Sequence, residues 1–337
     1  ALLLPGRTVP VAYAALTAAP NVSYSSAVNT IYIGSDSGAP PDSQPLTVPQ
    51  LAAALTSQNL NNLVLDKGGG AWLIKANVVI STTARLEATS TTIKDLRLDS
   101  PPVNPLSITA KLRGHLLING IKVSAWENNA LDTNVTNGRS YLLALNGGQM
   151  DILSSEIFNL GYTNGEPSGI SWRERVNDAD PTTGSTGSLL DSNVHDNYFG
   201  MYSYAAYNVK ILRNKVHDNL GYGIDPHTGT QNFEVANNEV YNNQYHGIIF
   251  SRDCINNWIH DNTVHDNVEH GIMLDRGSNN NLVENNTVYN NQDGFAIFES
   301  SHNTVRNNVS RNNAQTGIRI NASFIANDPF DDVATDN

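Results

Sequence analysis

The chain has 337 residues and a formal net charge of −12 at pH 7, with 39% hydrophobic and 15% charged residues. An acidic chain without a basic stripe excludes a typical nucleic-acid-binding protein. No run approaches the ~18 apolar residues of a membrane-spanning helix. Glycine, asparagine, serine and threonine are abundant, which favours an all-β fold. We therefore expect neither nucleic acid nor membrane as a partner.

The first 80 residues show no repeat. They open on ALLLPGRTVP, an apolar run that is too short for an intact signal peptide but fits a mature N-terminus left after cleavage. Residues 48–58, VPQLAAALTSQ, predict a short helix. The single cysteine, Cys254, excludes an internal disulfide and says little about the redox compartment.

The middle of the chain is β-like but irregular. Residues 85–170 contain short apolar runs, such as LLINGIKVSAW and MDILSSEIFNLG, without a strict period. The polar segment 173–187, RERVNDADPTTGSTG, predicts a loop. The tail, residues 326–337, is acidic and aperiodic, and we expect it to be loose.

A repeat of about 24 residues governs the rest of the chain. The segments NKVHDN (214–219), NEVYNN (238–243), NTVHDN (262–267) and NTVYNN (286–291) align, so that their valines are each 24 residues apart. A second marker keeps the same phase: a glycine followed by an apolar residue recurs at 223, 247, 271, 294 and 317. Repeats of this kind decide the fold.

A period of 21–24 residues with asparagines at fixed places predicts a right-handed parallel β-helix. Each coil would supply about three short strands, stacked ~4.8 Å from those of the next coil. Four asparagines, Asn219, Asn243, Asn267 and Asn291, are then expected to form one hydrogen-bonded ladder. A leucine-rich repeat would need a leucine framework that is missing, and a propeller would need a longer period.

The repeat also divides the chain into three expected parts. Residues 1–80 form an N-terminal segment whose helix caps the solenoid, because an open solenoid core needs such a cover. Residues 81–325 form the β-helix catalytic domain, with coils of about 22–24 residues. Residues 326–337 form the acidic tail.

The period allows side chains to be stacked by counting from each repeat glycine. The position just before the glycine holds Tyr222, His246 and His270. The position two residues after it holds Tyr202, Asp225, Ile249, Met273 and Ala296, and the position four after it holds Arg173, Tyr204, His227, Ser251, Asp275 and Phe298. The position five residues after the glycine holds Thr228, Arg252, Arg276 and Glu299. Pro226 has no N–H and should interrupt its strand. One concave face then carries cationic, aromatic and titratable groups, which indicates a groove for a charged sugar chain.

Simpler interpretations exist for several of these residues. His195, His217 and His265 recur at one repeat position, and we interpret them as structural. His246 and His270 are adjacent rungs, which the repeat alone accounts for in part. Arg252 and Arg276 have acidic neighbours with which they can pair. The Asp-Pro-His segment, 225–227, can be read as a turn with an incidental histidine.

At these residues the chain resembles the mannuronan C5-epimerases that edit alginate. The resemblance is carried by YGIDPH (222–227), HGIIFSRD (246–253) and GIMLDRGSNNN (271–281), in order and in phase with the repeat. It covers roughly 190–325 well and 85–190 by architecture, and it is greatest to the periplasmic type without calcium-binding repeats. Where the family usually has an acidic residue after the histidine, this chain has Thr228, and a second acidic position appears as Ser251.

The resemblance implies a right-handed β-helix, an alginate substrate and catalytic roles for Tyr222, Asp225 and His227. Epimerisation at C5 requires that the carboxylate be neutralised, that H5 be removed and that a proton return on the opposite face. Arg252 suits the first task, with help from a protonated Asp225. His227 is our choice as base and Tyr222 as acid, while His246 can exchange roles with either. Further expected substrate-binding residues are Arg173, Arg175, Lys122, Tyr204, His270, Asp275 and Arg276.

Two other functions stay open on sequence alone. A polyuronate lyase shares the first half of the reaction and then expels the 4-O-linked sugar. A non-catalytic carbohydrate-binding or adhesive β-helix is a third possibility, although it would not need the break at Asp-Pro-His. A glycoside hydrolase lacks a clear carboxylate pair.

No residue set predicts a metal site. His246 and His270 lack a third partner at ligand spacing, and calcium in the acidic loop 174–180 or in the tail has no support, so we expect no cofactor. The expected partner is an anionic polysaccharide such as polymannuronate, held by the local arginine cluster in spite of the overall negative charge. We expect a monomer that is secreted or periplasmic.

Overall fold

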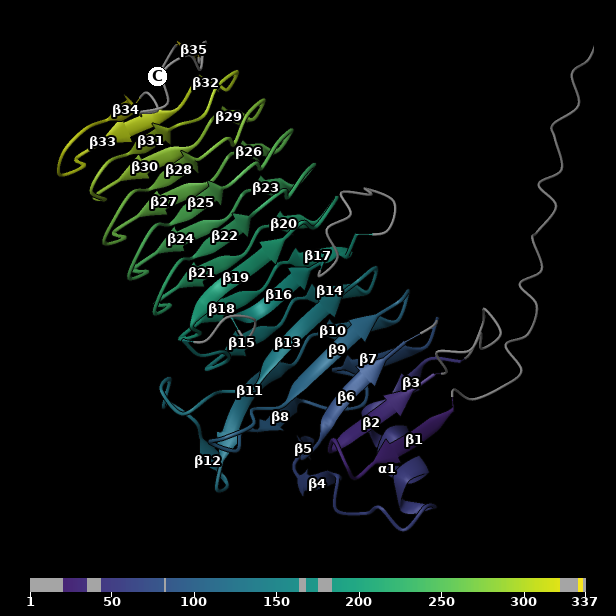
Figure 1. The fold of residues 1–337 in the computed structure, drawn as a ribbon. Helices are drawn as coiled ribbons and strands as arrows, with labels where there is room; N and C mark the ends of the chain where they lie inside the picture. The colour runs from purple at the N-terminus through teal and green to yellow at the C-terminus, as the bar shows by residue number, and fades with distance from the viewer. Residues whose placement is uncertain are drawn as a thin grey trace, which may run out of the picture.

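The computed structural model describes residues 21–34, 44–81, 83–163, 168–174, 184–321 and 333–335. Within them, the strands form three long sheets of 12, 11 and 12 strands, to which each successive coil adds one strand apiece. Figure 1 shows the sheets running side by side along a single elongated solenoid. Neighbouring strands are parallel throughout, except for the pairs β1–β2, β4–β5 and β11–β12.

The first sheet carries the face of interest here. Its strands, in spatial order, are β1 (Val22–Ser25), β2 (Thr30–Ile33), β6 (Asn77–Ile80), β9 (Ser107–Lys111), β13 (Tyr141–Leu145), β16 (Gly169–Arg173), β19 (Phe199–Tyr204), β22 (Ile224–His227), β25 (Ile248–Ser251), β28 (Ile272–Asp275), β31 (Phe295–Phe298) and β34 (Ile318–Asn321).

The other two sheets complete each coil. The second sheet contains β3 (Leu46–Thr47), β7 (Arg85–Thr89), β10 (His115–Asn119), β14 (Gln149–Leu153), β17 (Thr186–Leu190), β20 (Lys210–Leu212), β23 (Glu234–Ala236), β26 (Trp258–His260), β29 (Leu282–Glu284), β32 (Thr304–Arg306) and β35 (Val333–Thr335). The third contains β4 (Val64–Gly68), β5 (Ala71–Ile74), β8 (Asp95–Asp99), β11 (Lys122–Glu127), β15 (Glu156–Phe158), β18 (Asn193–His195), β21 (Lys215–His217), β24 (Glu239–Tyr241), β27 (Thr263–His265), β30 (Thr287–Tyr289) and β33 (Val309–Arg311), with β12 (Ala130–Leu131) beside β11.

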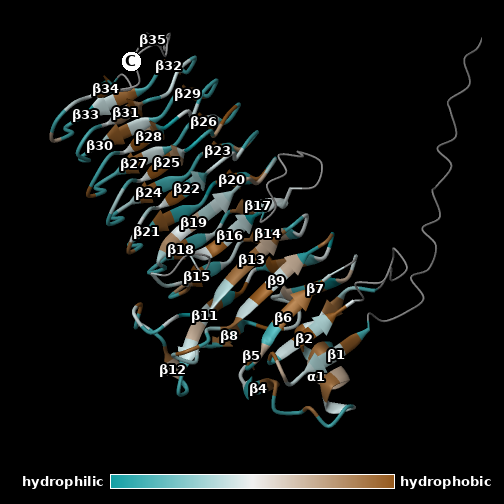
Figure 2. Cartoon of the chain, viewed as in Figure 1, coloured by the Kyte–Doolittle hydropathy of each residue, from teal (hydrophilic) through white to brown (hydrophobic). Residues whose placement is uncertain are grey.

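The core consists of stacks of equivalent apolar residues, to which each coil contributes several side chains. The repeat valines Val216, Val240, Val264 and Val288 are fully buried. They leave no room at the repeat glycines: a Cβ on Gly223 would lie 2.7 Å from Val240 Cγ1 and 2.6 Å from the Gly247 carbonyl oxygen. Figure 2 shows hydrophobic colour along the strands and hydrophilic colour in many of the turns. The predicted parallel β-helix is confirmed.

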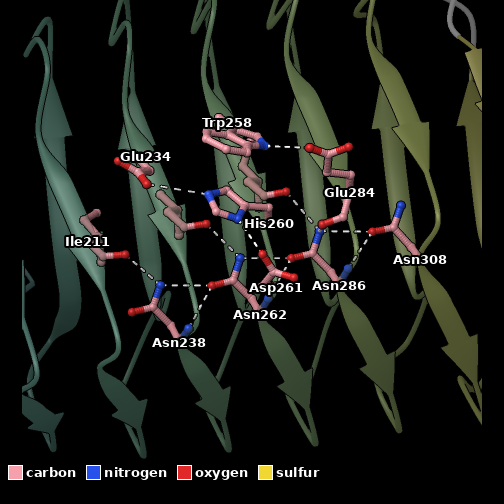
Figure 3. Close-up of polar contacts among 12 residues, drawn as sticks. Ile211, Glu234, Asn238, Trp258, His260, Asp261, Asn262, Glu284, Asn286 and Asn308 are labelled. Carbon is pink, nitrogen blue, oxygen red and sulfur yellow. Dashed lines mark hydrogen bonds and ion pairs between the residues drawn. The ribbon is translucent and has the colours of Figure 1, made fainter.

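Asparagine side chains hydrogen-bond the corners of successive coils. In the expected ladder, Asn243 Nδ2 donates to Asn267 Oδ1 at 2.9 Å, and Asn267 Nδ2 donates to Asn291 Oδ1 at 3.0 Å. A second ladder, through Asn238, Asn262, Asn286 and Asn308, repeats the arrangement (Figure 3). Each asparagine also satisfies backbone groups that would otherwise be buried without partners. The predicted ladder is confirmed.

The ends of the solenoid differ in part from expectation. The predicted helix is α1 (Val48–Thr56), which starts with a capping box between Thr47 and Gln50 and buries Val48, Leu51 and Leu55 at the N-terminal end. The parallel ladders extend beyond residues 81–325, because β2 pairs with β6 before residue 81 and β35 pairs with β32 inside the tail. The tail is therefore not loose at residues 333–335, and its remainder lies outside the described residues.

No helix in the described part of the chain has the length and apolar character needed to cross a bilayer.

The expected structural histidines lie on the third sheet. His195 stacks on His217 with ring centroids 5.1 Å apart, and His265 stacks on Tyr241 at the same separation. Their stacking along one sheet agrees with the interpretation that they are structural.

Candidate functional site

The outward side chains around β22 form the polar face that the register predicted. Strand pairing aligns Tyr202 with Asp225, and it aligns Tyr204 with His227 and then with Ser251. The same row begins at Arg173 and continues to Asp275 and Phe298, as expected. We refer to these residues, with Tyr222, Arg252 and Arg276, as the Asp225 face.

Pro226 interrupts one ladder, as predicted. Strand β22 pairs with β25 at Ile224–Ile248 and at His227–Ser251, but not at the two residues between them. The pairing with β19 on the other side is continuous. The missing proline N–H explains why only one side is broken.

Asp225 is buried although it lies on the outward face of the sheet. The residue is 2% exposed, and its Oδ1 has no hydrogen-bond partner in the structure. The following coils place Ile249, Met273 and Ala296 at this level, in an outer apolar cluster packed against Tyr222. Burial raises the pKa of the Asp225 carboxyl well above its ordinary value, against the opposing charges of Arg173 and Arg276. The carboxyl therefore favours its protonated form.

The His227 side chain, in contrast, favours the form without the extra proton. Burial, together with the positive charges of Arg252 and Arg276, lowers the pKa of its imidazole to about 4. Its Nδ1 lies 2.7 Å from the Thr228 hydroxyl, and its ring stacks on Tyr202 at 5.7 Å. The ring is therefore a neutral, oriented imidazole at neutral pH, as a general base must be.

Tyr222 begins a wall of stacked rings beside Asp225. Its ring centroid lies 5.3 Å from that of His246, which lies 5.0 Å from that of His270. Burial, together with the charges of Asp225 and Glu269, raises the pKa of the Tyr222 phenol to about 12. The phenol keeps its proton and can serve as a donor.

His246 has both ring nitrogens engaged. Its Nδ1 accepts the backbone N–H of His270 at 3.2 Å, and its Nε2 lies 3.2 Å from Glu269 Oε2. Burial lowers its pKa to about 3, with a smaller effect from His270. These contacts fix a neutral ring in the wall.

The cations at the other edge of the face differ in their pairing. Arg276 Nε lies 2.6 Å from Asp275 Oδ2, and the Ser251 hydroxyl donates to the same oxygen at 3.0 Å. Arg252 is exposed and has no ion pair with any described residue. Arg173 covers the Tyr202 ring, with its Cζ 4.5 Å from the ring centroid. Arg252 is thus the cation that is available to an incoming carboxylate.

Two of the expected binding residues are not brought to this face. Lys122 begins β11 in the third sheet and pairs with Glu156 at 2.7 Å, so the structure does not bring it to the Asp225 face. A surface cavity of about 560 Å³ lies beside Lys122, but it is lined by none of the groups of the Asp225 face. Arg175 lies outside the described residues.

Several neighbours of the site were not chosen from the sequence. Tyr202 pairs with Asp225 in the strand register, so the repeat spacing could have identified it as a neighbour of the site. Phe199 and Tyr245 lie 5.0 and 5.2 Å from the Tyr222 ring, centroid to centroid. Tyr245 and Glu269 belong to a corner without a recurring residue type, so no repeat signal marks them.

Metal ligands are not grouped in this region. Among the residues that the structure describes, no three His, Cys, Asp or Glu side chains are placed to hold a metal ion. Most of the acidic loop 174–180 and of the tail lies outside those residues.

Comparisons with known proteins agree with this geometry. A family model described as a right-handed β-helix region matches residues 229–337. The chain is 32% identical over 169 residues to a mannuronan C5-epimerase of Pseudomonas fluorescens, and 31% identical over 173 residues to mannuronan C5-epimerase AlgG of Azotobacter vinelandii. Each alignment covers 47% of this chain and 30% of the relative, so the chain spans less than a third of the length of the curated relatives it matches.

Solved structures extend the similarity over more of the chain. The crystal structure of the periplasmic alginate epimerase AlgG has a TM-score of 0.76 and 27% identity, over 86% of this chain and 67% of that one. The Dettilon tailspike protein, at 19% identity and a TM-score of 0.55, covers 84% of this chain and 55% of its own, and shares the fold alone. The expected resemblance to the mannuronan C5-epimerases is confirmed.

Proposed function

We propose that the Asp225 face catalyses the C5-epimerisation of β-D-mannuronate to α-L-guluronate residues within an alginate chain. The observation that carries this proposal is the arrangement of Tyr222, Asp225 and His227 along one coil. Asp225 is buried with an Oδ1 that has no partner in the structure, and burial favours a neutral imidazole at His227 and a protonated phenol at Tyr222. A sugar ring above Asp225 therefore has a base on one side and an acid on the other. The epimerases to which the chain is similar support the same reaction.

The substrate carboxylate is neutralised first. Arg252 offers a guanidinium without a competing ion pair, and it can bind the carboxylate through two parallel hydrogen bonds. The protonated Asp225 carboxyl donates a further hydrogen bond, because its pKa is raised and its Oδ1 has no partner within the structure. Together they stabilise the negative charge that builds up on the carboxylate when C5 loses its proton.

Proton removal and return follow on opposite faces of the sugar. His227 Nε2 takes H5, the C5–H bond breaks, and its electron pair spreads into the carboxylate as an enediolate. The Tyr222 O–H bond then breaks as its proton forms a new C5–H bond from the other side. The imidazolium and the phenolate exchange protons with water, which restores both groups. His246 is left out of this sequence because both its nitrogens are engaged.

A proton NMR time course on polymannuronate in deuterated water tests the reaction. We expect guluronate signals to appear with deuterium at C5 and without cleavage of the chain. Accumulation of an unsaturated, ultraviolet-absorbing uronate would instead assign a lyase. Binding without any product would assign a non-catalytic carbohydrate-binding protein.

We propose a monomeric enzyme without a resident metal that acts on an anionic polysaccharide in the periplasm or outside the cell. The similar crystal structure is that of a periplasmic alginate epimerase, which supports the compartment. Size-exclusion chromatography with light scattering, and assays with and without a chelator, test the oligomeric state and the metal independence.

A further inference from the structure

The second sheet carries an exposed aromatic ring that the Asp225 face does not use. Of the four tryptophans in the chain, all of them within described segments, Trp258 alone is exposed, at 42%. It begins β26, and its neighbours in the adjacent coils are Glu234 and Leu282. A large indole exposed on the outside of a solenoid offers a flat apolar surface on which a ligand can stack.

The indole is held flat and rigid. One of its faces stacks on the imidazole of His260, with ring centroids 3.7 Å apart and an interplanar angle of 23°. Its Nε1–H donates to Glu284 Oε1 at 3.0 Å (Figure 3). Arg306 Nη2 lies 2.7 Å from the other carboxylate oxygen, Glu284 Oε2. His260 is itself buried and bonded through Nδ1 to Asp261 at 2.7 Å. A ring ordered in advance loses little entropy when a ligand stacks on it.

Hydrogen-bonding groups border the ring. Glu234 lies one coil before Trp258, with Oε1 3.7 Å from His260 Nε2 and Oε2 3.3 Å from Lys210 Nζ. The Glu234 carboxylate is part-exposed and can accept bonds from vicinal hydroxyls, while Lys210 can donate. A flat apolar surface with a few polar groups at its edge is a typical small-ligand surface.

The local charges select among ligands. Lys210 and Arg306 are balanced by Glu234, Asp261 and Glu284, so this patch has no excess of positive charge. The Asp225 face differs, because there Arg173, Arg252 and Arg276 outnumber Asp275. A carboxylate-bearing sugar thus gains nothing from charge beside Trp258, whereas the C–H face of an uncharged pyranose fits the negative π-face of an indole.

We propose that Trp258, with Glu234 and Lys210 at its edge, forms a second carbohydrate-binding site, which takes an uncharged pyranose unit of a polysaccharide. The site lies on a different sheet from the Asp225 face and performs no chemistry. It gives the enzyme a way to be retained on a hydroxyl-rich polymer while the first sheet works on a charged one.

Calorimetric titration of the full chain with cellohexaose, mannohexaose and xylohexaose tests the proposal. We expect at least one of these neutral probes to bind, with an affinity that concentrated salt leaves unchanged. Trp258→Ala should lower that affinity about tenfold or more, since the stacking surface is removed. Trp258→Phe, which keeps a flat ring, should lose less.

Two matched variants serve as controls. Trp126→Ala removes a tryptophan whose ring is already covered by the Arg97 guanidinium at 3.8 Å, and it should leave binding unchanged. His227→Ala should leave binding unchanged and remove epimerisation, so the two proposals fail separately. Absence of binding to all three probes, or an equal affinity in a folded Trp258→Ala protein, overturns the proposal. Retention of alginate alone overturns the assignment to an uncharged sugar.

Discussion

Within one coil, two residues five positions apart are held in opposite proton-transfer roles mainly by burial. Tyr222 keeps its proton because ionisation would place a negative charge in a buried site near Asp225. His227 stays neutral because burial disfavours the imidazolium, and because a third positive charge would face Arg252 and Arg276. The same cause, loss of hydration, acts with opposite sign on the two groups because their charged forms differ. The pair thus stays ready as acid and base over a wide range of pH.

Replacement of His227 tests the base directly. We expect His227→Ala to lower kcat by about 10²–10⁴-fold, the usual contribution of a positioned acid–base group. In the parent enzyme, kcat/KM should fall as pH drops through about 4, where His227 gains its proton. It should also fall as pH rises through the elevated pKa of Asp225, which must stay protonated. A folded variant with full activity, shown by circular dichroism and turnover, contradicts the assignment.

The Thr228 hydroxyl tests how the imidazole of His227 is oriented. Its hydroxyl lies 2.7 Å from His227 Nδ1, and a proton on Nδ1 leaves the Nε2 lone pair free to act as base. Its φ of 30° is a left-handed value that a β-branched residue rarely adopts. We therefore assign Thr228 as a positioning residue for His227.

Thr228→Val keeps the shape and the branching of the side chain but removes the oxygen. We expect kcat to fall about tenfold, the value of one hydrogen bond, with KM little changed and with the acid limb of the pH profile displaced. Thr228→Ser should restore most of the rate. Equal kinetics for the valine and serine variants would show that the hydroxyl has no such role.

At the scale of the element, the period of the repeat determined most of the site. A strict 24-residue spacing from Gly223 to Gly271 fixes which side chains share a rung, so the rows through Asp225 and His227 were predictable. Lys122 lies within residues 85–170, which have no strict period that could assign it to a rung, and the structure places it on the third sheet. Two other features depend on side-chain packing, which the repeat period does not determine. They are the contact of Thr228 with His227 Nδ1 and the rings of Phe199 and Tyr245 beside Tyr222.

The corner ladder makes a prediction at this scale. Asn243 Oδ1 accepts from the backbone and the side chain of Asn219, and its Nδ2 donates to Asn267 Oδ1 at 2.9 Å. Asn243→Ala leaves those buried groups unpaired, and we expect it to lower the free energy of unfolding by about 2–4 kcal/mol. Gln244→Ala, at the exposed neighbouring position, should change it by less than about 0.5 kcal/mol. Denaturant titrations of both variants decide whether the ladder stabilises the solenoid.

At the scale of the whole molecule, the proposed reaction requires a chain of net charge −12 to bind a polyanion. The cations that would meet the substrate are gathered at one place, because Arg173, Arg252 and Arg276 act together at Asp225 and His227. At an ionic strength of 0.1 M, charges beyond about 10 Å are screened. The local cations then dominate the field that a bound uronate experiences.

This local group of arginines predicts how binding responds to salt. Between about 0.1 and 1 M salt the screening length falls from about 10 to 3 Å, so the attraction of the arginines is lost while little long-range repulsion remains to be relieved. The affinity of the parent enzyme for polymannuronate should therefore fall steadily across this range. Arg252→Ala should bind more weakly at 0.1 M and show a flatter dependence, because the unpaired cation is gone. Calorimetric titrations at several salt concentrations measure both slopes, and parallel slopes would exclude Arg252 as a carboxylate partner.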